Sequence, residues 1–239
     1  MPRRKPRPVT ARPRLIKRIA RITGKVLVWF LLVSVLWVLA YRFINPPITL
    51  LMIQRSWQGN SGEKIRIEKR WVKFEDISEN MKRAAVAAED QLFLKHIGFD
   101  IKAIEQAYAS NAKGKKIRGG STISQQTAKN VFLWPGRSFI RKGFEAYFTL
   151  LIELLWSKER ILEVYLNVIE MGNGIYGAEA AAQAYYGKSC KRLSKQEAAL
   201  IAACFPNPLR WSPKKPTRYI YHRQYLIMRN MRRLGPLDF

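Results

Sequence analysis

Two adjacent acidic residues, Glu89 and Asp90, lie in an apolar run and could provide a general base. Read as a helix, the segment 81–100 places apolar side chains one turn before and one turn after Glu89. Desolvation in such a stripe disfavours the charged carboxylate, which raises its pKa toward the range useful for base catalysis. The helical periodicity does not choose between the two acids. Spacing alone favours the alternative, a helix end at which both face water.

A second stretch that could bind a ligand begins at Gly120. Thr122 and Gln125 have the spacing of a capping box, and two glycines precede them. Such a helix start presents free backbone N–H groups and the positive end of the helix dipole, which together suit an anion. Most capping boxes, however, only begin a helix.

Basic and aromatic residues alternate after this helix start. Cations among aromatic rings suit a phosphate near a lipid surface or single-stranded nucleic acid. Glu145 follows Arg141 by four residues, and the alternative here is a surface ion pair worth little. The cations of this row are Lys129, Arg137, Arg141 and Lys142.

The whole chain has a formal net charge of +26, which favours a nucleic acid, anionic lipid or phosphorylated substrate as the partner. Residues 1–25 contain ten Lys or Arg and no acid. Only two cysteines occur, without metal-binding spacing. We expect Cys190 and Cys204 to be small buried side chains, with a disulfide as the alternative.

The basic start precedes a run of apolar residues, 26–41, that is nearly long enough to cross a bilayer. No cleavage site follows it, so we expect an uncleaved anchor. The charge difference predicts a cytoplasmic N-terminus and a periplasmic catalytic domain, with the inner membrane as the location. We expect residues 1–21 to be disordered, within a basic tail at residues 1–24, followed by a transmembrane anchor at 25–44, a linker or docking collar at 45–62 and one catalytic-size domain at 63–239.

The domain is predicted to be mainly α. One short strand is expected at residues 64–68, where apolar and polar residues alternate. Segment 144–156 is expected to be a core helix, and the helix that follows it to end at Gly172. Helix starts are predicted at Ser78, Thr122, Ser157, Ser194 and Thr217.

Five segments, in this order, resemble the family-51 glycosyltransferases that polymerise peptidoglycan. The resemblance covers roughly residues 60–235, with Ser124 where threonine is commoner in the family. Chain length and a single anchor resemble the family's monofunctional members. The five segments are 89–98, 120–126, 141–145, 158–167 and 184–188.

The resemblance implies a lysozyme-like helical fold with a smaller, membrane-touching lobe. It implies Glu89 as general base, and Glu145 as a residue that orients the cations or, with a metal, supports the leaving group. It implies binding of the diphosphate or lipid II by Ser121, Thr122, Gln125, Gln126, Lys129, Arg137, Arg141 and Lys142. It gives supporting roles to Asp90, Phe93, His96, Gly120, Lys158, Glu163 and Asn167.

The implied reaction joins lipid II to a growing glycan chain with inversion and releases undecaprenyl diphosphate. We expect no organic cofactor, while a divalent cation, magnesium or manganese, is left open. Expected partners are lipid II, the nascent glycan chain, membrane lipids and cell-division or wall-synthesis proteins, and no nucleic acid. The alternatives are a membrane-anchored lytic enzyme and a non-enzymatic membrane-binding module.

Overall fold

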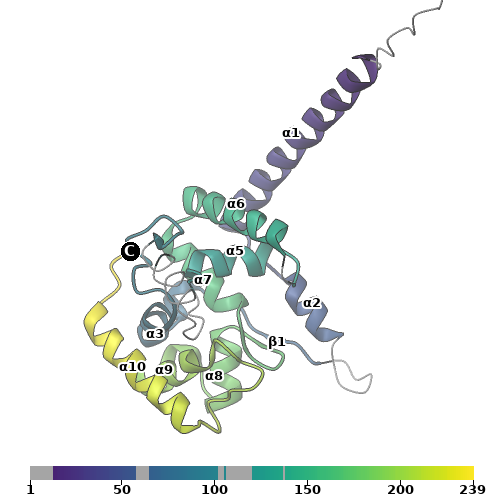
Figure 1. Cartoon of the computed structure of the whole chain (residues 1–239). Helices are drawn as coiled ribbons and strands as arrows, with labels where there is room; N and C mark the ends of the chain where they lie inside the picture. The colour runs from purple at the N-terminus through teal and green to yellow at the C-terminus, as the bar shows by residue number, and fades with distance from the viewer. Residues whose placement is uncertain (1–12, 58–64, 102–104, 106–119, 137) are drawn as a thin grey trace, which may run out of the picture.

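The computed structural model describes residues 13–57, 65–101, 105, 120–136 and 138–239, and its described part is mainly helical (Figure 1). This agrees with the predicted fold class. A three-stranded sheet in the order β1-β3-β2 is the regular β-structure of these residues. The elements are α1 (Pro13–Phe43), α2 (Leu50–Ser56), β1 (Glu68–Lys69), η2 (Phe74–Asp76), α3 (Glu79–Glu89), α5 (Ile123–Phe132), α6 (Phe139–Leu155), α7 (Lys158–Val168), β2 (Glu170–Gly172), β3 (Ile175–Tyr176), α8 (Ala178–Tyr186), η3 (Cys190–Arg192), α9 (Lys195–Cys204) and α10 (Arg218–Leu234).

Helix α1 extends away from the rest of the chain (Figure 1). Its segment Ile16–Phe43 is long and apolar enough to cross a membrane, by length and composition. The helix begins at Pro13, inside the tail that we expected to lack regular structure. Arg, Lys, Ala and Leu have high helix propensity, so the helix continues outward from the apolar run. Residues 1–12 lie outside the described part.

The end of α1 is fixed to the catalytic domain. Trp156 Nε1 donates to the Val38 carbonyl at 2.8 Å, and the Ser34 and Tyr147 hydroxyl oxygens lie 2.6 Å apart. The Arg160 guanidinium donates to the carbonyls of Tyr41 and Ile44, which satisfies acceptors left open at a helix end.

Helix α2 occupies part of the segment predicted as a linker, with Thr49 as its N-cap. A strongly apolar sequence in 48–53 explains why this segment packs instead of remaining extended, and Met52 is buried. A short packed helix therefore forms in the described part of the segment expected to be a linker or docking collar, and residues 58–62 lie outside the described part.

Two groups of helices build the domain around one core. In the first, α3 packs against both α9 and α10; in the second, α5 packs between α6 and α7. Apolar side chains on the inner faces of these helices form the core. Cys190 and Cys204 are buried free thiols, as expected.

Several predicted boundaries of helices and strands are confirmed, and others are wrong. The predicted N-caps are all observed, at Ser78, Thr122, Ser157, Ser194 and Thr217.

Helix α7 ends at Val168, before the predicted Gly172, because the chain then forms the β2–β3 hairpin. Of the strand expected at 64–68, residue 64 lies outside the described part, and strand is observed at Glu68–Lys69. Helix α6 is not fully a core helix, since Leu150 and Leu154 of the predicted segment are exposed.

Candidate active site

Glu89 is the last residue of α3, and the helix does not continue to Phe93 as the helical reading assumed. Its Oε2 accepts a hydrogen bond of 2.8 Å from Gln126 Nε2. Burial raises the pKa of Glu89, while the Gln126 hydrogen bond and the charges of Arg223 and Lys129 act in the opposite direction. A carboxylate so placed can accept a proton near neutral pH.

A cavity of about 270 Å³ opens beside Glu89. This gives the carboxylate access to a ligand despite its burial. Gly120, Ser121 and Thr122 form part of the wall, so the glycine-led segment faces this cavity. The other lining residues are Ala88, Asp90, Gln91, Leu92 and Asp100.

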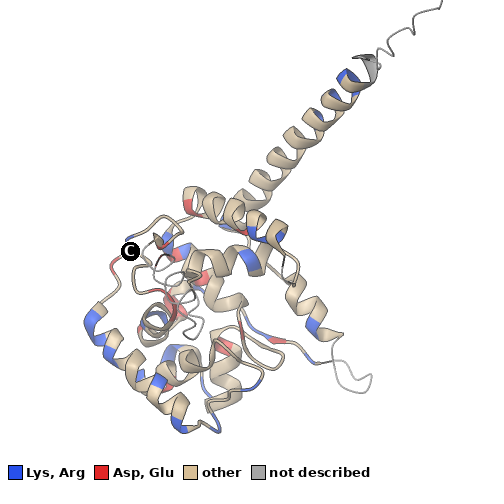
Figure 2. Ribbon diagram, viewed as in Figure 1, with Lys and Arg blue, Asp and Glu red and all other residues tan. Residues whose placement is uncertain are grey.

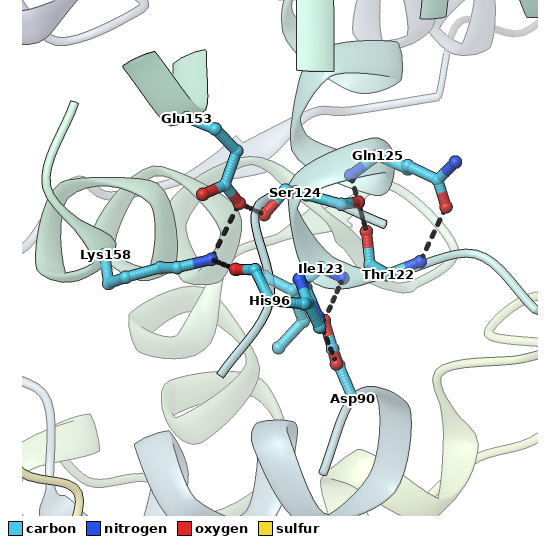
Figure 3. Close-up of polar contacts among 9 residues, drawn as sticks. Asp90, His96, Thr122, Ile123, Ser124, Gln125, Glu153 and Lys158 are labelled. Carbon is cyan, nitrogen blue, oxygen red and sulfur yellow. Dashed lines mark hydrogen bonds and ion pairs between the residues drawn. The ribbon is translucent and has the colours of Figure 1, made fainter. Parts of the chain in front are cut away.

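Asp90 has a different environment from its neighbour. One of its oxygens accepts from the Ile123 backbone N–H at 3.0 Å, at the first residue of α5. His96 Nε2 lies 2.9 and 3.1 Å from the two carboxylate oxygens (Figure 3). Asp90 is only 5% exposed, and its bonds fix α5 and the His96 loop against the end of α3. The structure thus gives Asp90 a positioning role, in which His96 takes part.

The start of α5 is closed by the chain's own atoms (Figure 3). The Thr122 hydroxyl accepts from the Gln125 N–H at 3.2 Å, and the Gln125 side chain accepts from the Thr122 N–H at 3.0 Å. Thr122 Oγ1 also donates to the Gly98 carbonyl at 2.6 Å. With Asp90 on the Ile123 N–H, the anion expected at this helix start is a carboxylate of the protein itself.

Lys158 supports the same region from α7. Its Nζ donates to the His96 carbonyl at 2.7 Å and to Glu153 Oε1 at 2.8 Å (Figure 3). It also lies 4.7 Å from the centre of the buried Phe93 ring. Glu153 in turn accepts from the Ser124 hydroxyl. Lys158 and Phe93 therefore support the loop after Glu89, as expected, whereas sequence reasoning gave Glu153 no role.

Two further motif residues hold the segment before α3. Glu163 Oε1 accepts from Trp71 Nε1 at 3.2 Å. The Asn167 side chain bonds to both the N–H and the carbonyl of Val72, each at 2.9 Å. These contacts explain why α7 carries polar residues on a face that is otherwise buried.

The cations of the predicted row gather where α5 and α6 meet. Glu145, 3% exposed, pairs with Arg141 at 3.4 Å and with Lys142. Burial lowers the pKa of Lys129, and Glu145 raises it in opposition. Arg141 Nε is buried and has no hydrogen-bond partner among the described atoms. Arg137 lies outside the described residues, so the structure does not place it.

Two adjoining cavities meet at Lys129. The first, of about 430 Å³, lies between Lys129, Arg141 and Trp134, against residues of α2. The second, of about 290 Å³, extends from Lys129 past Gln126 to the loop 205–209. Gln126 precedes Lys129 by three residues on α5, so one helix face joins the Glu89 carboxylate to the cations.

Sequence reasoning missed several residues beside these cavities. Arg55 on α2 pairs with Glu170 on β2 at 3.3 Å, and burial raises the pKa of Glu170. Tyr165 donates a long 3.4 Å bond to Gln126. Tyr165 lies in the family segment 158–167, but Arg55 and Glu170 belong to none of the five family segments, and only the fold brings these residues together.

Among the residues that the structure describes, no group of three or more His, Cys, Asp or Glu side chains could hold a metal ion. Glu145, the acid nearest the cation row, is already paired with Arg141 and Lys142. The described residues therefore do not fit a divalent cation at this position, and no step of the reaction is assigned to one.

The fold and the site define a helical enzyme domain joined to one long apolar helix, with a desolvated carboxylate and a separate group of cations. The chain belongs to the transglycosylase family, because the family model described as Transglycosylase matches residues 58–232. The expected lysozyme-like helical fold is the fold of this family.

Curated relatives cover nearly the whole chain. A protein of Pseudomonas putida (strain GB-1) named "Biosynthetic peptidoglycan transglycosylase" is 50% identical over 224 residues, 93% of each chain. A protein of the same name from Pseudomonas entomophila (strain L48) is 49% identical, over 92% of this chain and 94% of the relative. One from Stutzerimonas stutzeri (strain A1501) is 50% identical, over 89% and 88%.

Proposed function

We propose that this chain is a peptidoglycan glycosyltransferase that polymerises lipid II into β-1,4-linked glycan. The observation that carries the proposal is that one face of α5 joins a desolvated carboxylate, Glu89, to a group of cations that includes the partly buried Lys129. The relatives of the same length that bear the name peptidoglycan transglycosylase support the same reaction.

Glu89 is the proposed general base. The GlcNAc 4-hydroxyl of the acceptor gives its proton to the Glu89 carboxylate as its oxygen attacks C1 of the donor MurNAc. Attack from the face opposite the leaving group inverts C1, and the C1–O bond electrons leave with the diphosphate. Gln126, through its bond to Oε2, holds the carboxylate toward the cavity.

Lys129 and Arg141 are the proposed ligands of the diphosphate. Negative charge on the diphosphate grows as the C1–O bond breaks, so fixed cations stabilise the transition state more than the ground state. The unpartnered Arg141 Nε offers a donor for a phosphate oxygen. Glu145 orients the cations by its ion pairs, and Lys142 and Arg137 complete the proposed set.

The other predicted substrate ligands divide into two groups. Ser121 is exposed at the cavity wall and can contact lipid II, as can Gln126. Thr122 and Gln125 are buried in the capping box, so they act by shaping the wall. A lytic enzyme would share a buried glutamate, but cleavage of an uncharged glycan does not need the cations.

For topology, we propose that α1 spans the inner membrane with its N-terminus in the cytoplasm. The basic residues before the apolar run and the positive-inside rule support this orientation. A periplasm-only reporter fused after residue 60 should be active. Activity of a cytoplasm-only reporter at that junction would contradict both the orientation and the periplasmic reaction.

The direct test is the fate of purified lipid II incubated with the full chain. We expect the wild-type chain to form glycan polymer and free undecaprenyl diphosphate. The Glu89→Gln variant should form both products much more slowly. Hydrolysed fragments without polymer would favour the lytic alternative, and unchanged lipid II would favour a membrane-binding module.

A further inference from the structure

Helix α10 is firmly attached to the helix that carries Glu89. Ile220, Ile227 and Met231 are buried on its inner face, which packs against α3 and α9. Asn230 Nδ2 donates to the Ala87 carbonyl on α3 at 3.4 Å, and Arg83 donates to the Met231 carbonyl. The inner face of α10 thus has a structural role.

The outer face of α10 carries cations and a tyrosine in one row. These side chains are exposed, and the first five follow one another at intervals of three or four residues, so they lie on one side of the helix, with Arg233 beside the last of them. At about 1.5 Å per residue, the row is about 22 Å long. We define the basic stripe as Arg218, His222, Tyr225, Arg229, Arg232 and Arg233.

Helix stability does not account for the whole basic stripe. Arg218 lies in the first turn, where the helix dipole disfavours a cation, and the helix contains no acid. No carboxylate of the described residues pairs with Arg218 or Arg229. Tyr225 is 57% exposed and lies between these two arginines in the sequence of the helix. A face of this composition favours a polyanion that also offers surface to an aromatic ring.

The basic stripe lies far from the helix that can cross a membrane, which argues against a lipid surface as its partner. Helices α1 and α10 lie at opposite ends of the molecule (Figure 1), and Figure 2 shows the Lys and Arg residues along α10. Attraction to anionic lipid decays within a Debye length of about 8–10 Å. A helix at the far end of the domain is therefore poorly placed for it.

We infer that the basic stripe binds peptide-bearing peptidoglycan strands outside the active site. This inference rests on the proposed function, which makes such strands the product. The peptides of each strand carry free carboxylates, which arginine binds through charge-assisted hydrogen bonds, while the sugar rings can lie against Tyr225. Because α10 is fixed to α3, a strand held there stays close to the domain that made it.

The test measures binding of the full chain, in detergent, to purified soluble glycan strands with their peptides intact. The variant is Arg218→Gln with Arg229→Gln, and the control is Arg66→Gln with Arg70→Gln, which removes the same charge from two other exposed arginines. We expect the variant to bind about tenfold or more weakly and the control to bind within twofold of wild type. Strands stripped of their peptides by an amidase should bind wild type as weakly as the variant binds intact strands.

Lipid II polymerisation, measured on the same preparations, separates this inference from the proposed function. The variant should polymerise at an initial rate within about twofold of wild type, because the stripe lies outside the site. Wild-type affinity of the variant for intact strands would overturn the inference. The inference would also be overturned if the variant lost binding to phosphatidylglycerol vesicles but not to strands, because the stripe would then be a lipid contact. Failure of wild type to polymerise, with stripe-dependent strand binding retained, would overturn the proposed function alone.

Discussion

The two ends of α5 differ in how their polar groups are satisfied. At the start of the helix, Thr122 and Gln125 bond to each other and to nearby backbone. Further along the helix, Gln126 and Lys129 face cavities. Saturated polar groups position the helix, whereas groups that still face open space can meet a substrate.

The same contrast separates Glu89 from Asp90, although they are neighbours in the chain. Asp90 has three hydrogen-bond contacts to the protein, and Glu89 has one, from Gln126. Of the two carboxylates, only that of Glu89 retains the capacity to accept a proton from a ligand. Adjacent residues of the same charge therefore have opposite expected effects on activity and stability.

The largest expected effect is that of Glu89→Gln. The amide keeps the shape but cannot accept the proton, so polymerisation should fall about 10²–10⁴-fold. The thermal unfolding temperature should be unchanged or slightly higher, because an amide is easier to bury than a charge. Glu159→Gln, an exposed change on α7, serves as the control and should be neutral in both assays.

Asp90→Asn should act in the opposite way, mainly on stability. The amide oxygen can still accept from the Ile123 N–H, but the amide NH2 then faces His96 Nε2, so the charge-assisted contacts of the carboxylate are lost. The free energy of unfolding should fall by about 1–3 kcal/mol, measured by urea denaturation. Wild-type stability together with lost activity would show that the roles of the two acids are reversed.

A cap mutation compares the two capping boxes. Thr122→Ala removes a cap and also the bond to the Gly98 carbonyl, whereas Ser194→Ala on α9 removes a cap alone. Both should lower the free energy of unfolding, by about 1 kcal/mol for Ser194→Ala and somewhat more for Thr122→Ala. Equal losses would mean that the Gly98 bond contributes nothing.

The smallest expected effect is on the way in which kcat/KM and stability depend on pH. Burial raises the pKa of Glu89 above its ordinary value of 4.5, so kcat/KM should rise with pH through that elevated pKa. The unfolded chain loses this proton at lower pH than the folded one, so this residue makes stability decrease as pH rises between the two values. Glu89→Gln should remove that decrease. An acidic limb at the ordinary glutamate value would contradict the buried environment.

Local sequence patterns predicted the helix starts because a cap is a local interaction between residues three apart. Ser78, Thr122 and Thr217 were all found from their own side chains. The end of α3 was missed because it depends on distant partners. Asp90 leaves the helix to bond Ile123 on α5, a contact that no local pattern indicates.

The candidate site was predicted in part for the same reason. The family resemblance implied roles for Glu89 and Lys129, but not that Gln126 joins them. Arg55 and Glu170 meet only because α2 packs beside the β2–β3 hairpin, and the sequence predicted a linker where α2 forms. Such pairs depend on tertiary packing, which spacing along the chain does not encode.

The central claim is that the cations where α5 and α6 meet hold a diphosphate. It is tested most directly by measuring Lys129→Ala on two substrates, lipid II and finished sacculi, in one preparation. Loss of one positioned charged donor should lower polymerisation about a hundredfold in both kcat and kcat/KM. The exposed Lys73→Ala, as control, should keep the wild-type rate, and no variant should cleave sacculi. Polymerisation by Lys129→Ala at the wild-type rate, or cleavage of sacculi by the wild-type chain, would contradict the account.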